Sequence, residues 1–100
     1  MIIRETTMKR WDGAPCTEAH LTDMMEVAGH ADFLAIVQRM SADGEIVYRN
    51  VTINGADEVV VTVLFQDAEK CEAFEDEHLN LPWAKEMRRD YDITVTKASV

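Results

Sequence analysis

Apolar and polar residues change their spacing several times along this chain of 100 residues, and each change predicts a new element. β-Branched residues in alternation with polar ones predict strands, and apolar residues three or four positions apart predict amphipathic helices. The predicted strands cover residues 1–10, 45–53, 58–66 and 91–98, and the predicted helices cover residues 17–41, 68–78 and 82–89. The order β-α-β-β-α-β predicts one ferredoxin-like α+β domain over residues 1–100, with a four-stranded antiparallel sheet and helices on one face. Its first and third strands are expected to be central.

Turn and cap residues mark the ends of several elements. Asn54 and Gly55 both tolerate positive φ, which is typical of a tight hairpin between the second and third strands. Asp67 is expected to cap the helix that follows the third strand. Pro82 is suited to the first position of a helix, because it lacks the N–H that would be unpaired there.

The long helical segment over residues 17–41 allows two interpretations. Thr17 is expected to cap its start. Gly29 interrupts the apolar pattern, and Asp32 is placed to cap a second segment. The segment is therefore either one helix bent at Gly29 or two short helices.

The third strand is apolar on both of its faces. One set of alternating positions is expected to pack under the helices: Val59, Val61, Val63 and Phe65. Val60 and Leu64 lie on the other face, which the chain has no element left to cover. A second copy, packed sheet to sheet about a two-fold axis, would cover it, so we expect a homodimer. The alternative is an open sheet whose second face is partly wet.

The balance of charge argues against several partners. Lys and Arg number 10 and Asp and Glu number 19, so the formal charge is −9. Such a chain repels nucleic-acid phosphates and anionic membranes. The basic cluster over residues 85–89 is interleaved with acids and is typical of a solvated helix face. A monomeric RNA-binding module would stack bases on sheet aromatics, and the central strands offer only Phe65.

Cysteine content and the apolar runs indicate the compartment. Cys16 and Cys71 are too few for a disulfide scaffold, and we interpret both as reduced thiols. The chain shows no signal-peptide pattern at residues 1–5, and its longest apolar run, residues 59–65, is far shorter than a membrane span. We expect a soluble, cytoplasmic protein without a membrane segment.

Arg4 is unusual for a central strand. Arg4 and Glu5 are neighbours, so they point to opposite faces. If Arg4 faces a pocket, its guanidinium is suited to hold a ligand carboxylate through two hydrogen bonds. The alternative is a salt bridge at the rim of the sheet. Thr62 and Gln66 share the face of the third strand that we expect to meet the partner subunit, and we expect a pocket to be lined there.

His78 and Cys16 are the candidate reactive side chains. His78 ends an acidic helix, where the helix dipole and nearby carboxylates stabilise a histidine without any catalytic role; the alternative is a general base or haem ligand. Cys16 precedes the start of a helix, and His20 follows four residues later. This placement can lower the pKa of a thiol and make it a nucleophile. Against that role, we expect the loop that carries Cys16 to be exposed. The i, i+4 pairs Cys16–His20 and Glu26–His30 are too few ligands for a metal site.

Residues 63–83 resemble the dimeric α/β-barrel superfamily, which includes antibiotic-biosynthesis-monooxygenase-like, haem-degrading and stress-responsive barrel proteins. The shared features are a strand ending in an aromatic residue, an acidic cap, a helix with an Ala-Phe pair, and a second segment bearing an aromatic residue after a break: Phe65, Asp67, Ala73, Phe74, Pro82 and Trp83. The resemblance implies a homodimer with a cavity between each sheet and its helices or the partner sheet. Some members oxidise aromatic substrates without metal or flavin. The haem-degrading branch uses an Asn, a Trp and a His, but the first strand here has Thr6 and Thr7 and no Asn.

Two functional hypotheses follow. The first is a homodimer that binds a small, largely apolar molecule without a cofactor, with monooxygenase-like or isomerase-like activity. Its expected catalytic residue is His78, and its expected ligand-binding residues are Arg4, Thr6, Thr62, Gln66 and Trp83. The second hypothesis is a non-catalytic interaction or regulatory module whose dimer has no ligand cavity.

Overall fold

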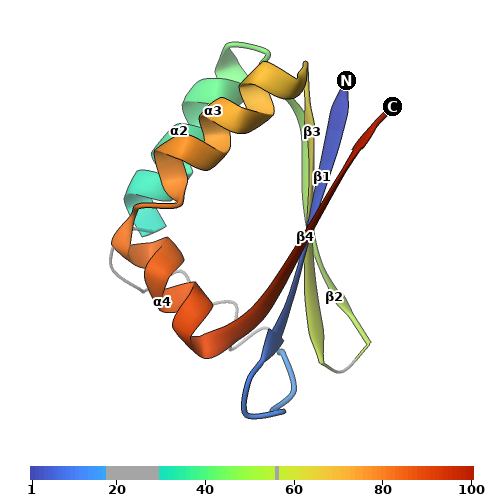
Figure 1. Cartoon of the computed structure of the whole chain (residues 1–100), viewed down its shortest axis with the longest axis vertical. Coiled ribbons are helices and arrows are strands. Elements are labelled where there is room, and N and C mark those ends of the chain that lie inside the picture. The colour runs from blue at the N-terminus through green and yellow to red at the C-terminus, as the bar shows by residue number, and fades with distance from the viewer. Residues whose placement is uncertain (18–29, 56) are drawn as a thin grey trace.

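A computed structural model describes residues 1–17, 30–55 and 57–100 (Figure 1). Its strands are β1 (Ile2–Arg10), β2 (Ile46–Asn54), β3 (Glu58–Phe65) and β4 (Tyr91–Ser99), and its helices are α2 (His30–Ala42), α3 (Ala68–His78) and α4 (Pro82–Asp90). The predicted order of elements is confirmed, with boundaries that differ by a few residues. The helix that Thr17 was predicted to cap and the bend at Gly29 lie outside the described residues.

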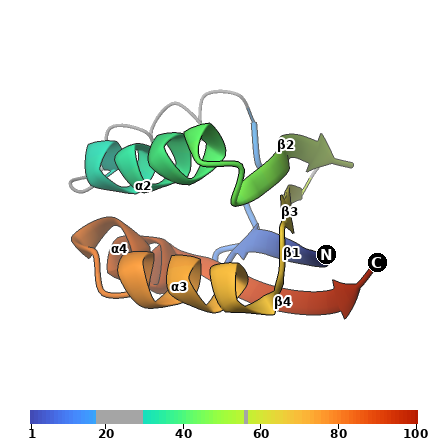
Figure 2. The same ribbon diagram turned by 90° about the horizontal axis from the view of Figure 1, so that it is seen from above.

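The strands form one antiparallel sheet in the order β2-β3-β1-β4, so β1 and β3 are central as predicted. Arg4 on β1 pairs with Val63 on β3 and with Lys97 on β4. The three described helices all lie on one side of the sheet, and this leaves the opposite sheet face without a helix (Figures 1 and 2). The fold is the ferredoxin-like α+β architecture.

Local chemistry explains the element boundaries. Asp67 has extended backbone angles and its side chain accepts a hydrogen bond of 2.9 Å from the Lys70 amide, so it caps α3 as predicted. Pro82 is the first residue of α4. Gly55 has a φ of 69° in the β2–β3 turn, a conformation that favours glycine. We expected Asp32 to cap a second helical segment. It lies instead in the first turn of α2, which begins at His30, so it is not the cap of that helix.

The core lies between the sheet and the helices. Val59, Val63 and Phe65 are 0–2% exposed, and they face the helices as predicted. Two groups of buried apolar side chains meet them. One comes mainly from α2 and α3: Phe33, Val37, Met40, Cys71 and Phe74. The other comes from β1, the loop after it, α4 and β4: Met8, Cys16, Met87 and Tyr91.

The two cysteines are both buried free thiols. Burial raises the pKa of the Cys71 thiol, and this residue packs as the small apolar side chain we predicted. Cys16 was expected in an exposed loop, and that expectation is wrong: its side chain is 3% exposed and its Sγ donates to the Asp57 carbonyl oxygen at 3.4 Å. The loop folds back over the second core group and this buries the thiol. None of the described helices is long and apolar enough to cross a membrane.

Candidate functional site

A cavity of about 430 Å³ lies on the helix-covered side of the sheet. This volume is within the range of small-molecule sites, which run from about 300 to 1,000 Å³. Most of the wall is apolar and comes from β1, β3 and β4 on one side and from the three helices on the other: Met8, Phe33, Val61, Val63, Phe74, Trp83, Met87 and Ile93. The cavity therefore suits a ligand with a largely apolar body.

The rim of the cavity is exposed and more polar. It includes Trp11, Leu79, Arg88 and Asp92. Trp11 is 63% exposed, and its indole Nε1 donates to the Arg88 carbonyl oxygen at 3.3 Å. This hydrogen bond ties the loop after β1 to helix α4 across one side of the opening.

Arg4 supplies the main polar group of the interior. It is only 7% exposed, and it lines the cavity, so Glu5 points to the opposite sheet face. Its Nε donates to Glu75 Oε2 at 3.2 Å, and its Nη1 donates to Thr6 Oγ1 at 2.9 Å. Its guanidinium carbon lies 5.7 Å from the centre of the Phe74 ring. These contacts hold a buried cation in a defined orientation at the α3 end of the cavity.

The Glu75 carboxylate is shared between two cations. Lys97 Nζ on β4 lies 2.9 Å from Glu75 Oε1, while Arg4 binds the other oxygen. Burial by itself would raise the pKa of Glu75, but hydrogen bonds from Lys97 and Arg4 outweigh this effect and lower it. Glu75 is therefore an anion at neutral pH and links β1, α3 and β4 at this corner.

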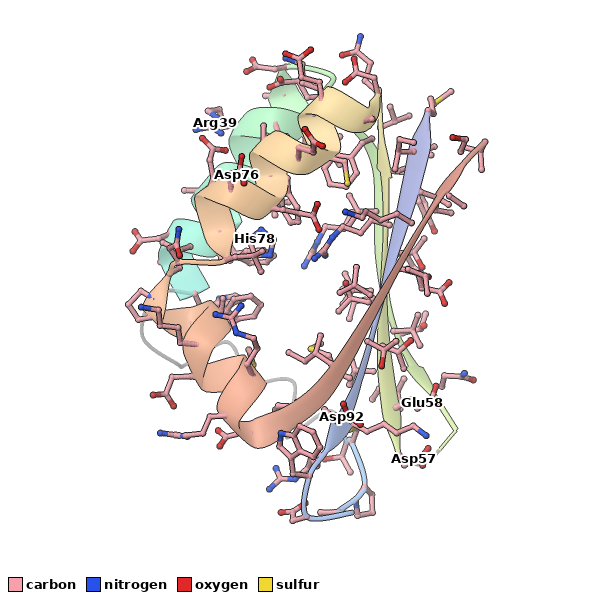
Figure 3. The ribbon with its side chains drawn as sticks, viewed as in Figure 1. Arg39, Asp57, Glu58, Asp76, His78 and Asp92 are labelled. Carbon is pink, nitrogen blue, oxygen red and sulfur yellow. The ribbon has the colours of Figure 1, made fainter. Side chains whose placement is uncertain are left out.

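His78 is held as a neutral imidazole in the cavity wall. Figure 3 shows it at the end of α3, directed toward the space between the helices and the sheet. It is 6% exposed, and its Nδ1 lies 2.6 Å from the Phe74 carbonyl oxygen. A carbonyl can only accept, so Nδ1 carries the proton and Nε2 is left as the acceptor. Burial lowers the pKa of His78, and the charges of Arg4 and Arg88 act in the same direction. The hydrogen bond to Phe74 and the charge of Glu75 raise the pKa, but the net effect is a lowered pKa.

Aromatic rings form the wall next to His78. Phe33 and Trp83 stack with ring centres 4.4 Å apart and planes 21° apart. The His78 ring lies 5.5 Å from Phe33 and 4.2 Å from Phe74, measured between ring centres. Flat, rigid surfaces of this kind are complementary to planar ligands.

Arg49 on β2 supports this wall from outside the cavity. Its guanidinium carbon lies 5.8 Å from the centre of the Phe33 ring, and its buried Nε has no hydrogen-bond partner within the described residues. Burial lowers the pKa of Arg49. Burial and the Arg49 charge both lower the pKa of His30, whose ring centre is 5.4 Å from that of Trp83.

The structure brings together four of the six residues predicted for a site. Arg4, Thr6, His78 and Trp83 all line the cavity, whereas Thr62 and Gln66 do not. Thr62 pairs with Glu5 across the β1–β3 ladder, so both side chains lie on the face away from the helices. Gln66 is exposed beyond the end of β3. We expected Thr62 and Gln66 to border the same pocket as Arg4, but neither of them lines the cavity.

Sequence reasoning missed Glu75 and Tyr91 as residues of the cavity. Glu75 precedes His78 by three positions on α3, so the helical spacing places both on one face. That signal was available, but we considered the acids of this helix only as carboxylates that stabilise His78. Tyr91 starts β4 and is 4% exposed. Its inward direction depends on the register of β4, for which the sequence carries no marker.

Metal-binding groups are not evident in the part of the chain that the structure describes. No cluster of three or more His, Cys, Asp or Glu side chains is placed to hold an ion there. His20 and Glu26, the partners in the two predicted i, i+4 pairs, lie outside the described residues.

Comparison with solved structures shows the same fold across the whole chain. A Deinococcus radiodurans protein, described as a candidate antibiotic biosynthesis monooxygenase, is 15% identical with a TM-score of 0.63, and the match covers 100% of this chain and 92% of that one. A variant of SnoaB, a cofactor-independent oxygenase from Streptomyces nogalater, is 11% identical with a TM-score of 0.67 and covers 99% and 92%.

A dimeric ferredoxin-like protein from an uncultured marine organism is 13% identical with a TM-score of 0.66, and the match covers 100% of this chain and 94% of that one. These matches confirm the fold that the resemblance of residues 63–83 predicted. No family model matches the chain, and no curated protein matches its sequence.

Proposed function

We propose that the cavity binds a compact, largely apolar aromatic molecule and that His78 removes a proton from it in a monooxygenase-like reaction. The observation that carries the proposal is the buried, neutral His78 with its Nδ1 proton held by the Phe74 carbonyl. A general base must be unprotonated near its working pH and must present its free nitrogen to the substrate. The lowered pKa of His78 meets the first requirement, and the tautomer supports the second because it leaves Nε2 without a proton.

The chemistry needs no group beyond substrate and dioxygen. His78 Nε2 takes a proton from a CH₂ group made acidic by neighbouring aromatic rings and a carbonyl. The carbanion then passes electrons to dioxygen. Overall the CH₂ group and O₂ give a carbonyl group and water, so the substrate is the reductant. An isomerase would use the same base but would return the proton to another carbon, and it would consume no oxygen.

The fold supports this proposal at a coarser level. SnoaB shares the architecture, and it is described as a cofactor-independent oxygenase. The stacked Phe33–Trp83 wall and the cavity of about 430 Å³ fit a planar substrate. A cavity of this size counts against the alternative, a non-catalytic module whose interior is filled.

We propose also that the protein is a homodimer joined through the sheet face away from the helices. Ile3, Val60 and Leu64 are only half-buried on that face. Burying such apolar surface stabilises association by roughly 25 cal/mol per Å² before the costs of binding are counted. The marine ferredoxin-like protein of the same fold is described as dimeric, which supports this arrangement.

Oxidation of anthrone tests the enzymatic proposal. Anthrone has a CH₂ group between two aromatic rings opposite a carbonyl, and its oxidation is followed by oxygen uptake and product absorbance against a protein-free control. His78→Gln should slow turnover by about 100-fold or more, which is the scale of a lost general base. His30→Gln is the matched control, since His30 also has a lowered pKa but does not line the cavity. Wild-type turnover in His78→Gln would refute the role of His78.

A further inference from the structure

Arg4, which lines the cavity, shares its carboxylate partner at the α3 end with a second cation, Lys97, which does not line it. Arg4 and Lys97 both bind the same carboxylate, Glu75, one to each oxygen. Two cations therefore share one anion, and His78 beside them is held neutral. The pairing of two cations with one carboxylate is a local feature, since the chain as a whole carries a formal charge of −9.

Arg4 keeps donors available for a ligand. A guanidinium has five N–H donors. The structure uses the Nε donor on Glu75 and one Nη1 donor on Thr6. Nη2 has no hydrogen-bond partner within the described residues, and it is not fully buried. Since Arg4 lines the cavity, we take this donor to be open to a ligand there.

Apolar neighbours of Arg4 strengthen the hydrogen bonds that its guanidinium makes. Phe74 lies under the guanidinium, and Val63 is the residue opposite Arg4 on β3. Apolar neighbours lower the local dielectric, so a charge-assisted hydrogen bond is stronger here than at the surface. A neutral apolar ligand alone would leave these donors unpaired and desolvated, at a cost to its binding.

We infer that the ligand of this cavity is an aromatic acid, whose single anionic oxygen group binds Arg4 while its rings lie between the sheet and the Phe33–Trp83 wall. The inference rests on the proposed function, because it needs the same cavity, and it narrows the substrate class. The guanidinium fork suits a carboxylate or an ionised hydroxyl group. The charge of this group would be bound by Arg4, so the Nε2 of His78 is left free to act on the ring system.

Binding of three two-ring probes tests the inference: naphthalene, 2-naphthol and 2-naphthoate. The quenching of the tryptophan fluorescence gives each dissociation constant, because Trp83 and Trp11 line the cavity. We expect wild-type protein at pH 7 to bind at least one of the two oxygen-bearing probes about 10-fold more tightly than naphthalene. The tighter of the two identifies the acid group: 2-naphthoate is an anion at pH 7, whereas 2-naphthol is neutral in solution at that pH and supports the inference only if its absorption shows that it binds as the naphtholate.

Two variants at the corner should move acid binding in opposite directions. Arg4→Gln should weaken binding of the preferred acid by about 10-fold or more, the scale of one hydrogen bond to a charged group. Glu75→Gln removes the carboxylate that competes for Arg4, so it should tighten the binding of the preferred acid. Lys9→Gln is the control, because it removes the same charge from an exposed ion pair with Glu58 that is outside the cavity. Naphthalene binding should not weaken in any of the three variants, which would report an intact cavity, and it should tighten in Arg4→Gln, where the unpaired donors are removed.

The outcomes separate this inference from the proposed function. If naphthalene binds and neither acid binds more tightly, the inference is overturned and the apolar cavity stands. The inference is overturned also if Arg4→Gln keeps full acid affinity. If no probe binds wild-type protein, both proposals fail. Should Arg4→Gln not fold, tighter acid binding by Glu75→Gln supports the inference, and unchanged or weaker binding overturns it.

Discussion

The two faces of the sheet use similar side chains and reach different degrees of burial. On β3, Val59 and Phe65 point toward the helices and are 0% exposed, while Val60 and Leu64 on the other face are only half-buried. Alternation along the strand decides which face a side chain occupies, but the element that covers the face decides how far it is buried. The helix-covered face also contains the cavity, so the same packing that buries Phe65 defines the candidate site.

The largest expected effect comes from truncation on the covered face. Phe65→Ala should lower the free energy of unfolding by about 3–5 kcal/mol, because it leaves a void among side chains that cannot fully close it. Urea denaturation at low protein concentration measures the loss. Leu64→Ala on the open face is the comparison, and it should cost clearly less under the same conditions. Equal losses would contradict the difference between the faces.

A charge on the open face should break the proposed dimer. Leu64→Glu places a carboxylate where the partner sheet would pack, and an unpaired buried charge is strongly unfavourable. We expect dimerisation to weaken by about 100-fold or more, or about 2.7 kcal/mol, as measured by sedimentation equilibrium. Gln38→Glu on the exposed side of α2 adds the same charge and should leave the mass unchanged. A wild-type particle of 11.4 kDa at micromolar concentration would contradict the dimer.

Removal of the α3 cap should loosen the cover of the inner face without altering the sheet. Asp67→Ala leaves the Lys70 amide without its acceptor and should cost about 1 kcal/mol in thermal or urea unfolding. Asp76→Ala removes the same charge from an exposed position later in α3 and should cost little or nothing. A loss of equal size in both variants would indicate a charge effect instead of a cap.

A smaller effect is expected in the pH dependence of stability. The pKa of His78 in the folded state lies below its value in the unfolded chain, which is near 6.5. As pH falls from 7 to 5, the unfolded chain therefore takes up a proton first, and stability decreases. His78→Gln should reduce this decrease, and above pH 7 the two proteins should show the same slope. His30 contributes in the same direction, so a His30→Gln variant separates the two.

Much of the fold could be predicted because its signals are local. The Asn54–Gly55 turn, the Asp67 cap and Pro82 at the start of α4 each depend on the chemistry of one or two residues. The polar residues Thr62 and Gln66 on one set of alternating positions likewise predicted that the other set on β3 faces the helices. The buried position of Cys16 was missed, because it depends on where a loop returns against Asp57, far along the chain.

The candidate site was only partly predictable. Arg4 and His78 stood out as a charged residue in a central strand and a histidine at a helix end. Thr62 was assigned to the pocket because we placed the pocket between two sheets, whereas the cavity lies under the helices. The pairing of Thr62 with Glu5 places it on the opposite face from Arg4, and the register that decides this is a long-range property.

The chain by itself determined the order of its elements, the alternation of faces along each strand and the excess of negative charge, because these follow from spacing and local chemistry. Only the tertiary structure decided that Arg4, Glu75 and His78 line one end of an apolar cavity and that Lys97 binds Glu75 there. They come from β1, α3 and β4, and their distances depend on strand register and helix packing. Both arise from the sum of many weak contacts across the whole domain, which no short stretch of sequence encodes.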